Sequence, residues 1–345
     1  MKPFSDLTEL GRARRMRRVA ERAVQSYNLA VTRLRCVATE TNTIFRVDAA
    51  DGRSFALRVG ALRQDTDVDV ATELAWVAAL NRDTELPVVH AFPNRDGEFI
   101  TFAGDDDVPE ERRCVMFGWL FGRVLDDRAA PSTYARLGEI AAGLARHGQG
   151  WKPPTGLQPL VWDRIFHYPT EAVVMFDPDN RNVMTPARLR VFRKVMDRAE
   201  AELARLRDTQ PRGWLHGDLN PWNAMVNRAR VTVFDFEDVT LGPPVQDVAT
   251  ALLYGRDRSD YWDLRQAFQD GYEPVLPWPV EYDGQLELLM AARSINFVNY
   301  VIRTGDEADG EYSPAADTAR VTKRLERYLS DFPEWPPRQL GRGKS

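Results

Sequence analysis

The sequence predicts an α+β protein with two lobes, a small β-rich N-terminal lobe and a larger, mostly α-helical C-terminal lobe. The chain has 345 residues, of which 43% are hydrophobic and 28% charged, and this composition is ordinary for a globular protein with two packed lobes. Strand-like patterns are concentrated in the first third of the chain, and helical periodicity dominates from Gly118 onward. We therefore expect lobes at 1–117 and 118–330, followed by a flexible, proline-containing tail at 331–345.

The elements of the N-terminal lobe are predicted from turn signals and periodicity. Asp51 and Gly52 separate two segments rich in β-branched and aromatic residues, which predicts an antiparallel hairpin. An amphipathic helix that ends before Pro87 and two further strands complete a β-β-α-β-β order. The hairpin strands are expected at 42–47 and 54–59, the helix around Val70, Leu74, Val77 and Ala78, and the later strands at 98–102 and 113–117.

Two apolar stripes predict long helices in the C-terminal lobe. Thr185 followed by Pro186 is a good helix start, because Thr caps free amides and Pro tolerates the first helical position. The first stripe consists of Leu137, Ile140, Ala141 and Leu144, and the second of Phe192, Val195, Met196, Ala199, Leu203 and Leu206.

The charge and cysteine content argue against several classes of protein. The net charge of −5 is unlike that of nucleic-acid-binding proteins, which carry an excess of Lys and Arg. The basic run between Arg12 and Arg22 is interpreted as the solvated face of an N-terminal helix, and a role at nucleic acid or a membrane surface is the alternative. Cys36 and Cys114 lack the spacing of a metal or redox motif, and no apolar run suits a signal peptide or membrane span. We expect a cytoplasmic protein with neither nucleic-acid nor membrane partners.

The segment from Trp214 to Asn223, followed by 231–237, carries the strongest chemical signal. Phosphoryl transfer needs a carboxylate that orients or deprotonates the attacking hydroxyl, together with oxygen ligands for the metal that holds the nucleotide phosphates. Asp218, Asn223 and Asp235 offer these groups on loops, the last of them at the end of a predicted strand. The alternative interpretation is a capped turn followed by an exposed hairpin.

These residues resemble the signature of a known family. His216-Gly217-Asp218 with Asn223, followed by Asp235-Phe236-Glu237, is similar to the pattern of the aminoglycoside phosphotransferase and choline kinase superfamily, whose members are relatives of protein kinases. The resemblance extends over roughly residues 30 to 300, in order. Other matching positions are Thr41, Asn42, Arg58, Glu73, Gly118, Trp119, Leu120 and Gly242 to Asp247.

The resemblance implies a bilobal, protein-kinase-like fold that binds ATP or GTP with Mg²⁺. It implies that Asp218 is the catalytic base and that Asn223 and Asp235 bind Mg²⁺. The nucleotide would lie between the lobes against the connection from Gly118 through Trp119 to Leu120. The hairpin loop that contains Thr41 and Asn42 would cover the phosphates, although it lacks the glycines of the protein-kinase loop.

Arg58 departs from the family pattern, in which a lysine usually pairs with phosphate. A guanidinium keeps the charge and forks onto phosphate or onto Glu73, with a geometry different from that of an ammonium. The alternatives are a surface charge on a strand for Arg58 and an exposed helix position for Glu73.

Three supporting residues keep more than one interpretation. His216 is read as a packed histidine that hydrogen-bonds loop backbone, with a general base as the alternative, because Asp218 already supplies the carboxylate. Asp247 is a helix cap, or the brace of the catalytic loop that the resemblance implies, or both. Glu237 supports the metal ligands from behind, binds a second metal ion, or faces water.

The expected acceptor is the hydroxyl group of a small molecule. Only a short segment separates Asp235 from Asp247, which leaves no room for the long activation segment of protein kinases. Candidates are aminoglycosides, choline, homoserine and sugars; the alternatives are a compact bacterial Ser/Thr protein kinase and a non-catalytic nucleotide-binding scaffold. An acidic, aromatic pocket that suits a cation would come from Trp162, Asp163, Asp177, Asp179, Trp262, Asp263, Asn296 and Asn299.

Overall fold

A computed structural model shows two compact units, each of which is described by itself. It describes residues 3–39, 42–60, 67–126, 128–157, 160–168, 171–305 and 312–336. Unit 1 consists of Met1–Val124, Pro153–Gln158 and Ala224–Glu237, and unit 2 of Leu125–Lys152, Pro159–Asn223 and Asp238–Ser345. The units are therefore interleaved in sequence, and the predicted lobe boundaries stay a prediction.

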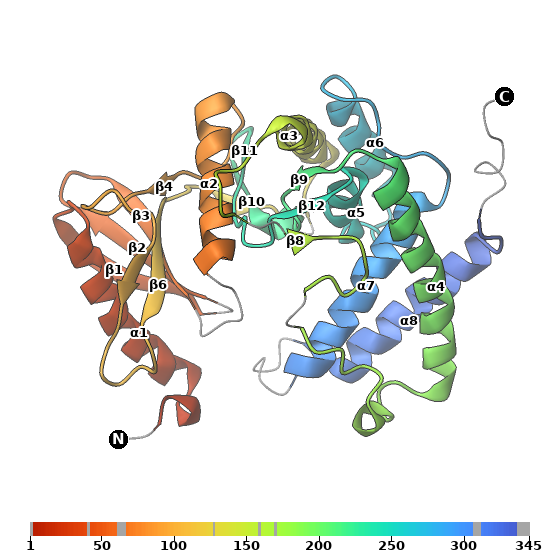
Figure 1. Ribbon diagram of the computed structural model, residues 1–345, viewed down its shortest axis with the longest axis horizontal. Helices are drawn as coiled ribbons and strands as arrows, with labels where there is room; N and C mark the ends of the chain where they lie inside the picture. Colours follow the sequence, from red (N-terminus) through yellow and green to blue (C-terminus); the bar gives the residue numbers. More distant parts are fainter. Residues whose placement is uncertain are drawn as a thin grey trace. The chain divides into compact units, whose positions relative to one another are not determined.

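Unit 1 contains an antiparallel sheet covered on one face by helix α1 (Glu9–Ala23), as Figure 1 shows. The predicted hairpin is confirmed, with Gly52 at φ 85° in its turn. Met16, Val19 and Ala20 of α1 pack into the same core as Phe45 and Leu57 of the sheet. The strand order is β1 (Val31–Thr39), β2 (Thr43–Ala49), β3 (Ser54–Val59), β6 (Arg112–Gly118) and β4 (Ala91–Phe92), and β5 (Thr101–Ala103) also pairs with β6.

The arginines of α1 lie mostly on an exposed face, as predicted, but the sequence did not show that some of them bind an acidic turn. Arg18 and Arg22 form ion pairs with Asp105 in the acidic turn between β5 and β6. Arg15 is buried and donates a hydrogen bond to the carbonyl oxygen of Asp107. The basic helix and the acidic turn therefore neutralise each other within unit 1.

Two further elements complete unit 1. Helix α2 (Asp67–Asp83) confirms the helix predicted before Pro87. A small antiparallel sheet contains β11 (Arg230–Val233), β10 (Ala224–Asn227) and β7 (Arg123–Val124), and Val233 also forms a bridge with Val88. This second sheet carries the chain to Asp235.

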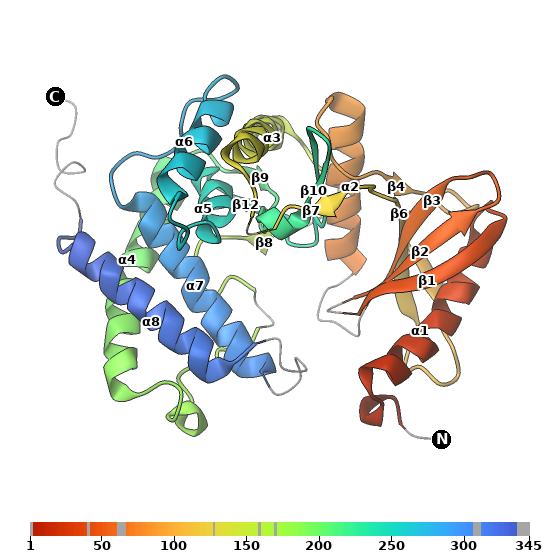
Figure 2. The same ribbon diagram turned by 180° about the vertical axis from the view of Figure 1, so that it is seen from behind.

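Unit 2 is mostly helical, as predicted. Figure 2 shows α4, α7 and α8 side by side, and α7 also packs against α5. Thr185 caps α4 by accepting a hydrogen bond from the Arg188 N–H at 3.4 Å. The helices are α3 (Pro131–Gly150), α4 (Pro186–Thr209), α5 (Val245–Leu253), α6 (Tyr261–Tyr272), α7 (Gln285–Thr304) and α8 (Pro314–Asp331). A three-stranded sheet is formed by β8 (Leu160–Val161), β12 (Thr240–Gly242) and β9 (Gly213–Leu215).

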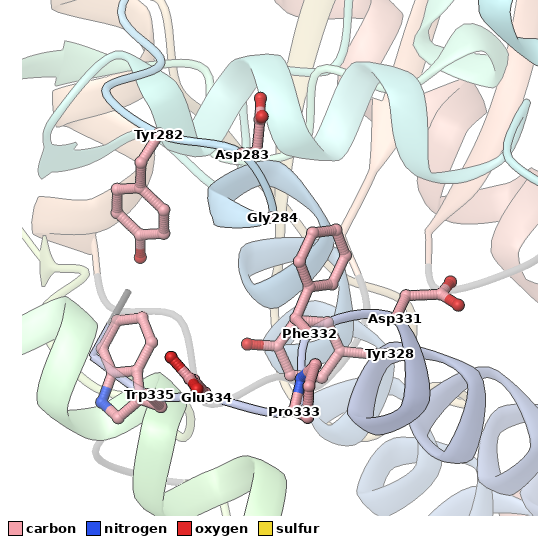
Figure 3. A pocket seen from close by; sticks show the side chains of 9 residues that line it. All are labelled: Tyr282, Asp283, Gly284, Tyr328, Asp331, Phe332, Pro333, Glu334 and Trp335. Atoms are coloured by element: carbon pink, nitrogen blue, oxygen red, sulfur yellow. The ribbon is translucent and has the colours of Figure 1, made fainter. Parts of the chain in front are cut away.

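The first part of the predicted tail packs on unit 2. Arg198 donates hydrogen bonds to the carbonyl oxygens of Phe332 and Pro333, at 2.6 and 2.8 Å. A cavity of about 290 Å³ lies between this segment and the start of α7. Figure 3 shows the lining residues, which are Tyr282, Asp283, Gly284, Tyr328, Asp331, Phe332, Pro333, Glu334 and Trp335. Residues 337–345 lie outside the described part of the chain. Among the described residues, no helix has the length and apolar character needed to span a membrane.

Candidate active site

The loop after β9 needs a glycine to place Asp218. Gly217 has φ 80°, a left-handed conformation that side chains disfavour. A Cβ atom at Gly217 would lie 1.9 Å from the carbonyl oxygen of Asp238, so no larger residue fits there. The chain therefore turns sharply between the buried strand and Asp218.

Two loop asparagines and an arginine from α7 hold the Asp218 carboxylate. Oδ2 accepts hydrogen bonds from Asn220 Nδ2 at 2.8 Å and Asn223 Nδ2 at 2.9 Å. Oδ1 pairs with Arg293 Nη2 at 3.0 Å, and 20% of the Asp218 side chain is exposed. Because Asn223 uses its nitrogen in these bonds, its side-chain oxygen is the atom that it offers to a cation.

Asp247 braces the same loop from the first turn of α5. Its Oδ2 accepts a hydrogen bond from the His216 N–H at 2.8 Å, and its Oδ1 accepts one from the Gly217 N–H at 3.0 Å. The helix cap is Pro244, so the interpretation of Asp247 as the cap is wrong. Burial raises the pKa of Asp247 to about 7, although these two N–H groups favour the ionised form.

His216 is completely buried and contacts loop backbone. Its Nδ1 accepts a hydrogen bond from the Asp218 N–H at 3.3 Å, which agrees with the interpretation of a packed histidine. Sequence reasoning gave no role to the nearby Tyr168, whose hydroxyl donates a hydrogen bond to Asp238. Burial and the Asp238 carboxylate raise the pKa of Tyr168 well above its ordinary value, so this phenol stays protonated.

The sequence did not predict a role for Arg293, which is the cationic residue that contacts Asp218 directly. Its guanidinium lies 5.8 Å from the centre of the Trp162 ring, and Nη1 donates a long hydrogen bond of 3.5 Å to Asn296 Oδ1. Burial alone would lower the pKa of Arg293, but Asp218, Tyr168 and Asp238 together raise it. Arg293 lies 75 residues from Asp218 in sequence, so no local pattern announces the pair.

Unit 1 holds a second cluster, centred on Arg58. Arg58 forms a bidentate ion pair with Glu73, at 2.9 and 2.6 Å, and a further ion pair with Glu237 at 2.9 Å. Arg58 and Glu73 are 8% and 2% exposed, so the alternatives of a surface charge and an exposed helix position are both wrong. Asn42 donates a hydrogen bond to Oε1 of Glu237, the same oxygen that pairs with Arg58.

Burial by itself would lower the pKa of Arg58, yet the nearby carboxylates of Glu73, Glu237 and Asp235 raise it above its ordinary value. Asp235 is exposed and has φ 65°, an uncommon conformation for a residue with a side chain. The next residue, Phe236, is fully buried against Trp76 of α2, with ring centres 5.7 Å apart. The Phe236 anchor thus fixes the backbone beside Asp235.

The proposed metal ligands present suitable atoms. Asn223 in unit 2 and Asp235 in unit 1 both offer oxygen donors, which Mg²⁺ favours. Mg²⁺ also keeps several waters and binds substrate phosphates, so it needs few protein ligands. Within the described residues, no three His, Cys, Asp or Glu side chains form a ready metal cluster. The described residues therefore contain no metal site built from such protein ligands alone.

Comparison with known proteins decides the family. The family model described as "Phosphotransferase enzyme family" matches residues 36–282, which is most of the chain. The chain belongs to this phosphotransferase family. It is an enzyme of the phosphotransferase class, as the sequence predicted.

Solved structures confirm the kinase-like fold of this phosphotransferase. A microcompartment-associated aminopropanol kinase is similar over 91% of this chain and 98% of its own, with TM-score 0.72 and 20% identity. An amicoumacin kinase in complex with AMP-PNP, Ca²⁺ and Ami matches over 94% and 96%, with TM-score 0.72 and 14% identity. A choline kinase from Streptococcus pneumoniae matches over 91% and 99%, with TM-score 0.61 and 15% identity. No curated protein matches this chain.

The residues expected to form the acceptor pocket of the phosphotransferase do not all gather in one place. Trp162 and Asn296 contact Arg293, whereas Asn299 is buried and binds the backbone of residues 172–175. Of the expected acidic groups, Asp163 pairs with the adjacent Arg164. Asp177, Asp179, Trp262 and Asp263 are exposed.

The remaining predicted nucleotide-binding positions all belong to unit 1. Gly118 ends β6 and donates a hydrogen bond to the His90 carbonyl oxygen at 2.9 Å. Trp119 lies under the Arg46 guanidinium at 4.9 Å, and Leu120 is partly buried. Thr41 lies outside the described residues. Their contacts with nucleotide stay a prediction.

Proposed function

We propose that this phosphotransferase transfers the γ-phosphoryl group of ATP or GTP, with Mg²⁺, to a hydroxyl group of a small molecule. The observation that carries the proposal is the fixed carboxylate of Asp218, held by Asn220, Asn223 and Arg293 on a loop braced by Asp247. Such a rigid carboxylate suits a group that must orient an attacking hydroxyl in line with phosphate.

In this proposal Asp218 accepts the proton of the acceptor hydroxyl. Asn223 and Asp235 would hold Mg²⁺, which neutralises charge on the nucleotide phosphates. By the family resemblance Arg58 would bind those phosphates, and Glu73 and Glu237 hold its planar guanidinium in one orientation. The other nucleotide-binding positions are Thr41, Asn42, Gly118, Trp119 and Leu120, with His216, Glu237 and Asp247 in support.

A small-molecule acceptor is favoured by the short segment between Asp235 and Asp247, in which β12 follows after a few residues. The similar structures named above are those of kinases for aminopropanol, amicoumacin and choline, which are all small molecules. We propose the same general class of acceptor for this chain.

The test is nucleotide consumption with a panel of acceptors. The protein is incubated with MgATP or MgGTP and with amino alcohols, sugars, hydroxy acids and aminoglycosides, and ADP or GDP formation and phosphorylated product are measured. We expect transfer to at least one small molecule, and its loss in Asp218→Asn. Transfer only to protein substrates would instead support a Ser/Thr protein kinase, and nucleotide binding without any turnover would support a scaffold.

We also propose a cytoplasmic location without nucleic-acid partners. The net charge of −5 supports the second part. The low cysteine content, two residues without the spacing of a redox or metal motif, supports the first part. Fractionation of cells that make the tagged protein tests the location.

A further inference from the structure

The hydrogen-bond capacity of the Asp218 carboxylate limits where an acceptor hydroxyl binds. A carboxylate has about four acceptor positions, two on each oxygen. Asn220 and Asn223 occupy both positions of Oδ2, and Arg293 occupies one position of Oδ1. The remaining position, on Oδ1, is the one open to a hydroxyl group.

This position lies beside the guanidinium of Arg293. Two groups that each bind the same oxygen at about 3 Å, and that are separated by the trigonal angle of about 120°, lie about 5 Å apart. A substituent two or three bonds from the acceptor hydroxyl therefore comes into direct range of Arg293. The charge of this substituent decides whether the contact is attractive or repulsive.

The other charged groups around this position already have partners. Asp238 accepts a hydrogen bond from Tyr168, and Glu171 lies 3.7 Å from Arg303 and also contacts Asn296. Arg293 has five N–H groups, of which one binds Asp218 and one makes the long contact with Asn296. Its side chain keeps 16% exposure, and the Trp162 ring lies against its guanidinium. Arg293 is therefore the charged group with most unused hydrogen-bonding capacity near the hydroxyl position.

We propose that the acceptor carries a carboxylate close to the hydroxyl that is phosphorylated, and that Arg293 selects this acceptor by binding the carboxylate. The inference rests on the proposed function of the same site. An amino alcohol would place its ammonium near the Arg293 guanidinium; because the Asp218 carboxylate offsets part of this repulsion, we expect a preference of about 10-fold against the ammonium. This proposal differs from the cationic acceptor expected from the sequence, which stays a prediction.

The test compares acceptors that differ in one charged group. Two sets are used: glycolate, ethanolamine and ethylene glycol, and then 3-hydroxypropanoate, 3-aminopropan-1-ol and propane-1,3-diol. The ratio of kcat/KM for the carboxylate member to that for the ammonium member is measured by product formation with MgATP. We expect this ratio to exceed about 10 in at least one set, and to fall at least about 10-fold in Arg293→Gln.

Two further variants make the ratio diagnostic. Arg293→Lys keeps a positive charge and is expected to keep the preference for the carboxylate, although its rate falls with all acceptors. Arg265→Gln is the matched control, because Arg265 pairs with Glu287, and neither residue contacts Asp218, Arg293 or Asn296 among the contacts described above. Its ratio is expected to stay within about 2-fold of the parent, because substitutions at separate sites act independently. Because a ratio cancels a general loss of activity, disturbance of Asp218 does not imitate the predicted change.

The outcomes separate this inference from the proposed function. Transfer confined to neutral or ammonium-bearing acceptors overturns the inference and leaves the proposed function intact. An acceptor ratio that is unchanged in Arg293→Gln also overturns it. A protein that consumes no nucleotide with any acceptor overturns both.

Discussion

Replacement of Arg58 by alanine tests the buried ion-pair cluster of unit 1. The change removes both bonds to Glu73 and the ion pair with Glu237, and Glu73 is only 2% exposed. Removal of one partner of a buried ion pair costs about 3 to 5 kcal/mol, because it leaves a charge in a poorly solvated place. We expect Arg58→Ala to lower the free energy of unfolding by about that amount.

Two companion variants show that charge burial is the cause. Arg58→Lys keeps the charge but not the fork, so its loss is expected to be smaller, about 1 to 3 kcal/mol. The double variant Arg58→Met with Glu73→Leu removes both charges and is expected to be more stable than Arg58→Ala. Nucleotide affinity at fixed Mg²⁺ is expected to follow the order parent, lysine, alanine.

Urea unfolding is followed by tryptophan fluorescence and by amide hydrogen exchange of β3 and α2, because a chain with two units need not unfold in one step. If the free energy of unfolding of Arg58→Ala lies within about 0.5 kcal/mol of that of the parent, as is usual for surface changes, the argument from charge burial is refuted.

Three more predictions follow from the loops. Because the pKa of Asp247 is raised to about 7 in the folded protein, its contribution to stability is complete below pH 3.8 and is lost as the pH rises through about 7. Relative to Asp247→Asn, the free energy of unfolding of the parent should therefore fall by about 2 to 3 kcal/mol between pH 5 and 8. Urea unfolding at several pH values tests this, and an equal pH dependence in the two proteins would contradict it. Gly217→Ala should abolish transfer and destabilise the fold, because the new Cβ atom would overlap the Asp238 carbonyl oxygen. Gly52 has a similar φ, but no atom lies within 4 Å of its Cβ position, so Gly52→Ala should lower the free energy of unfolding by only about 1 kcal/mol. Similar melting temperatures for the two variants would contradict the steric argument. Asn223→Ala and Asp235→Ala should each weaken Mg²⁺-dependent nucleotide binding at least about 10-fold by calorimetry, and unchanged affinity would remove them from the metal site.

Local signals predicted most of the large elements. The Asp51 and Gly52 turn located the hairpin, because a two-strand turn needs a residue that tolerates positive φ. Apolar residues that recur with the helical period located α2, α3 and α4, because the apolar face that this period creates is the face by which such helices pack. Strands of two residues, such as β4 and β7, were not predicted, since they are too short to show a period.

The chemical loop was predicted better than its surroundings. Asp218 and Asn223 lie five residues apart in one segment, so the sequence itself places them together. Arg293 reaches Asp218 across 75 residues, and Arg18 reaches Asp105 across 87, so both pairs depend on tertiary packing. For Arg58 the sequence offered Glu73 as a partner, and the pair is confirmed, whereas the ion pair with Glu237 was not predicted. These long-range pairs are what the structure adds to the sequence.

The central claim is that Asp218 activates the acceptor hydroxyl. The most direct test is single-turnover transfer from MgATP to the best acceptor of the panel in Asp218→Asn, with nucleotide affinity measured in parallel. The account predicts a transfer rate at least about 10²-fold below the parent with nearly unchanged nucleotide affinity, because the change removes the proton acceptor and leaves the phosphate-binding groups in place. The matched control Asp208→Asn, at an exposed carboxylate that pairs with its neighbour Arg207, should transfer at the parent rate. Transfer by Asp218→Asn at the parent rate would contradict the account.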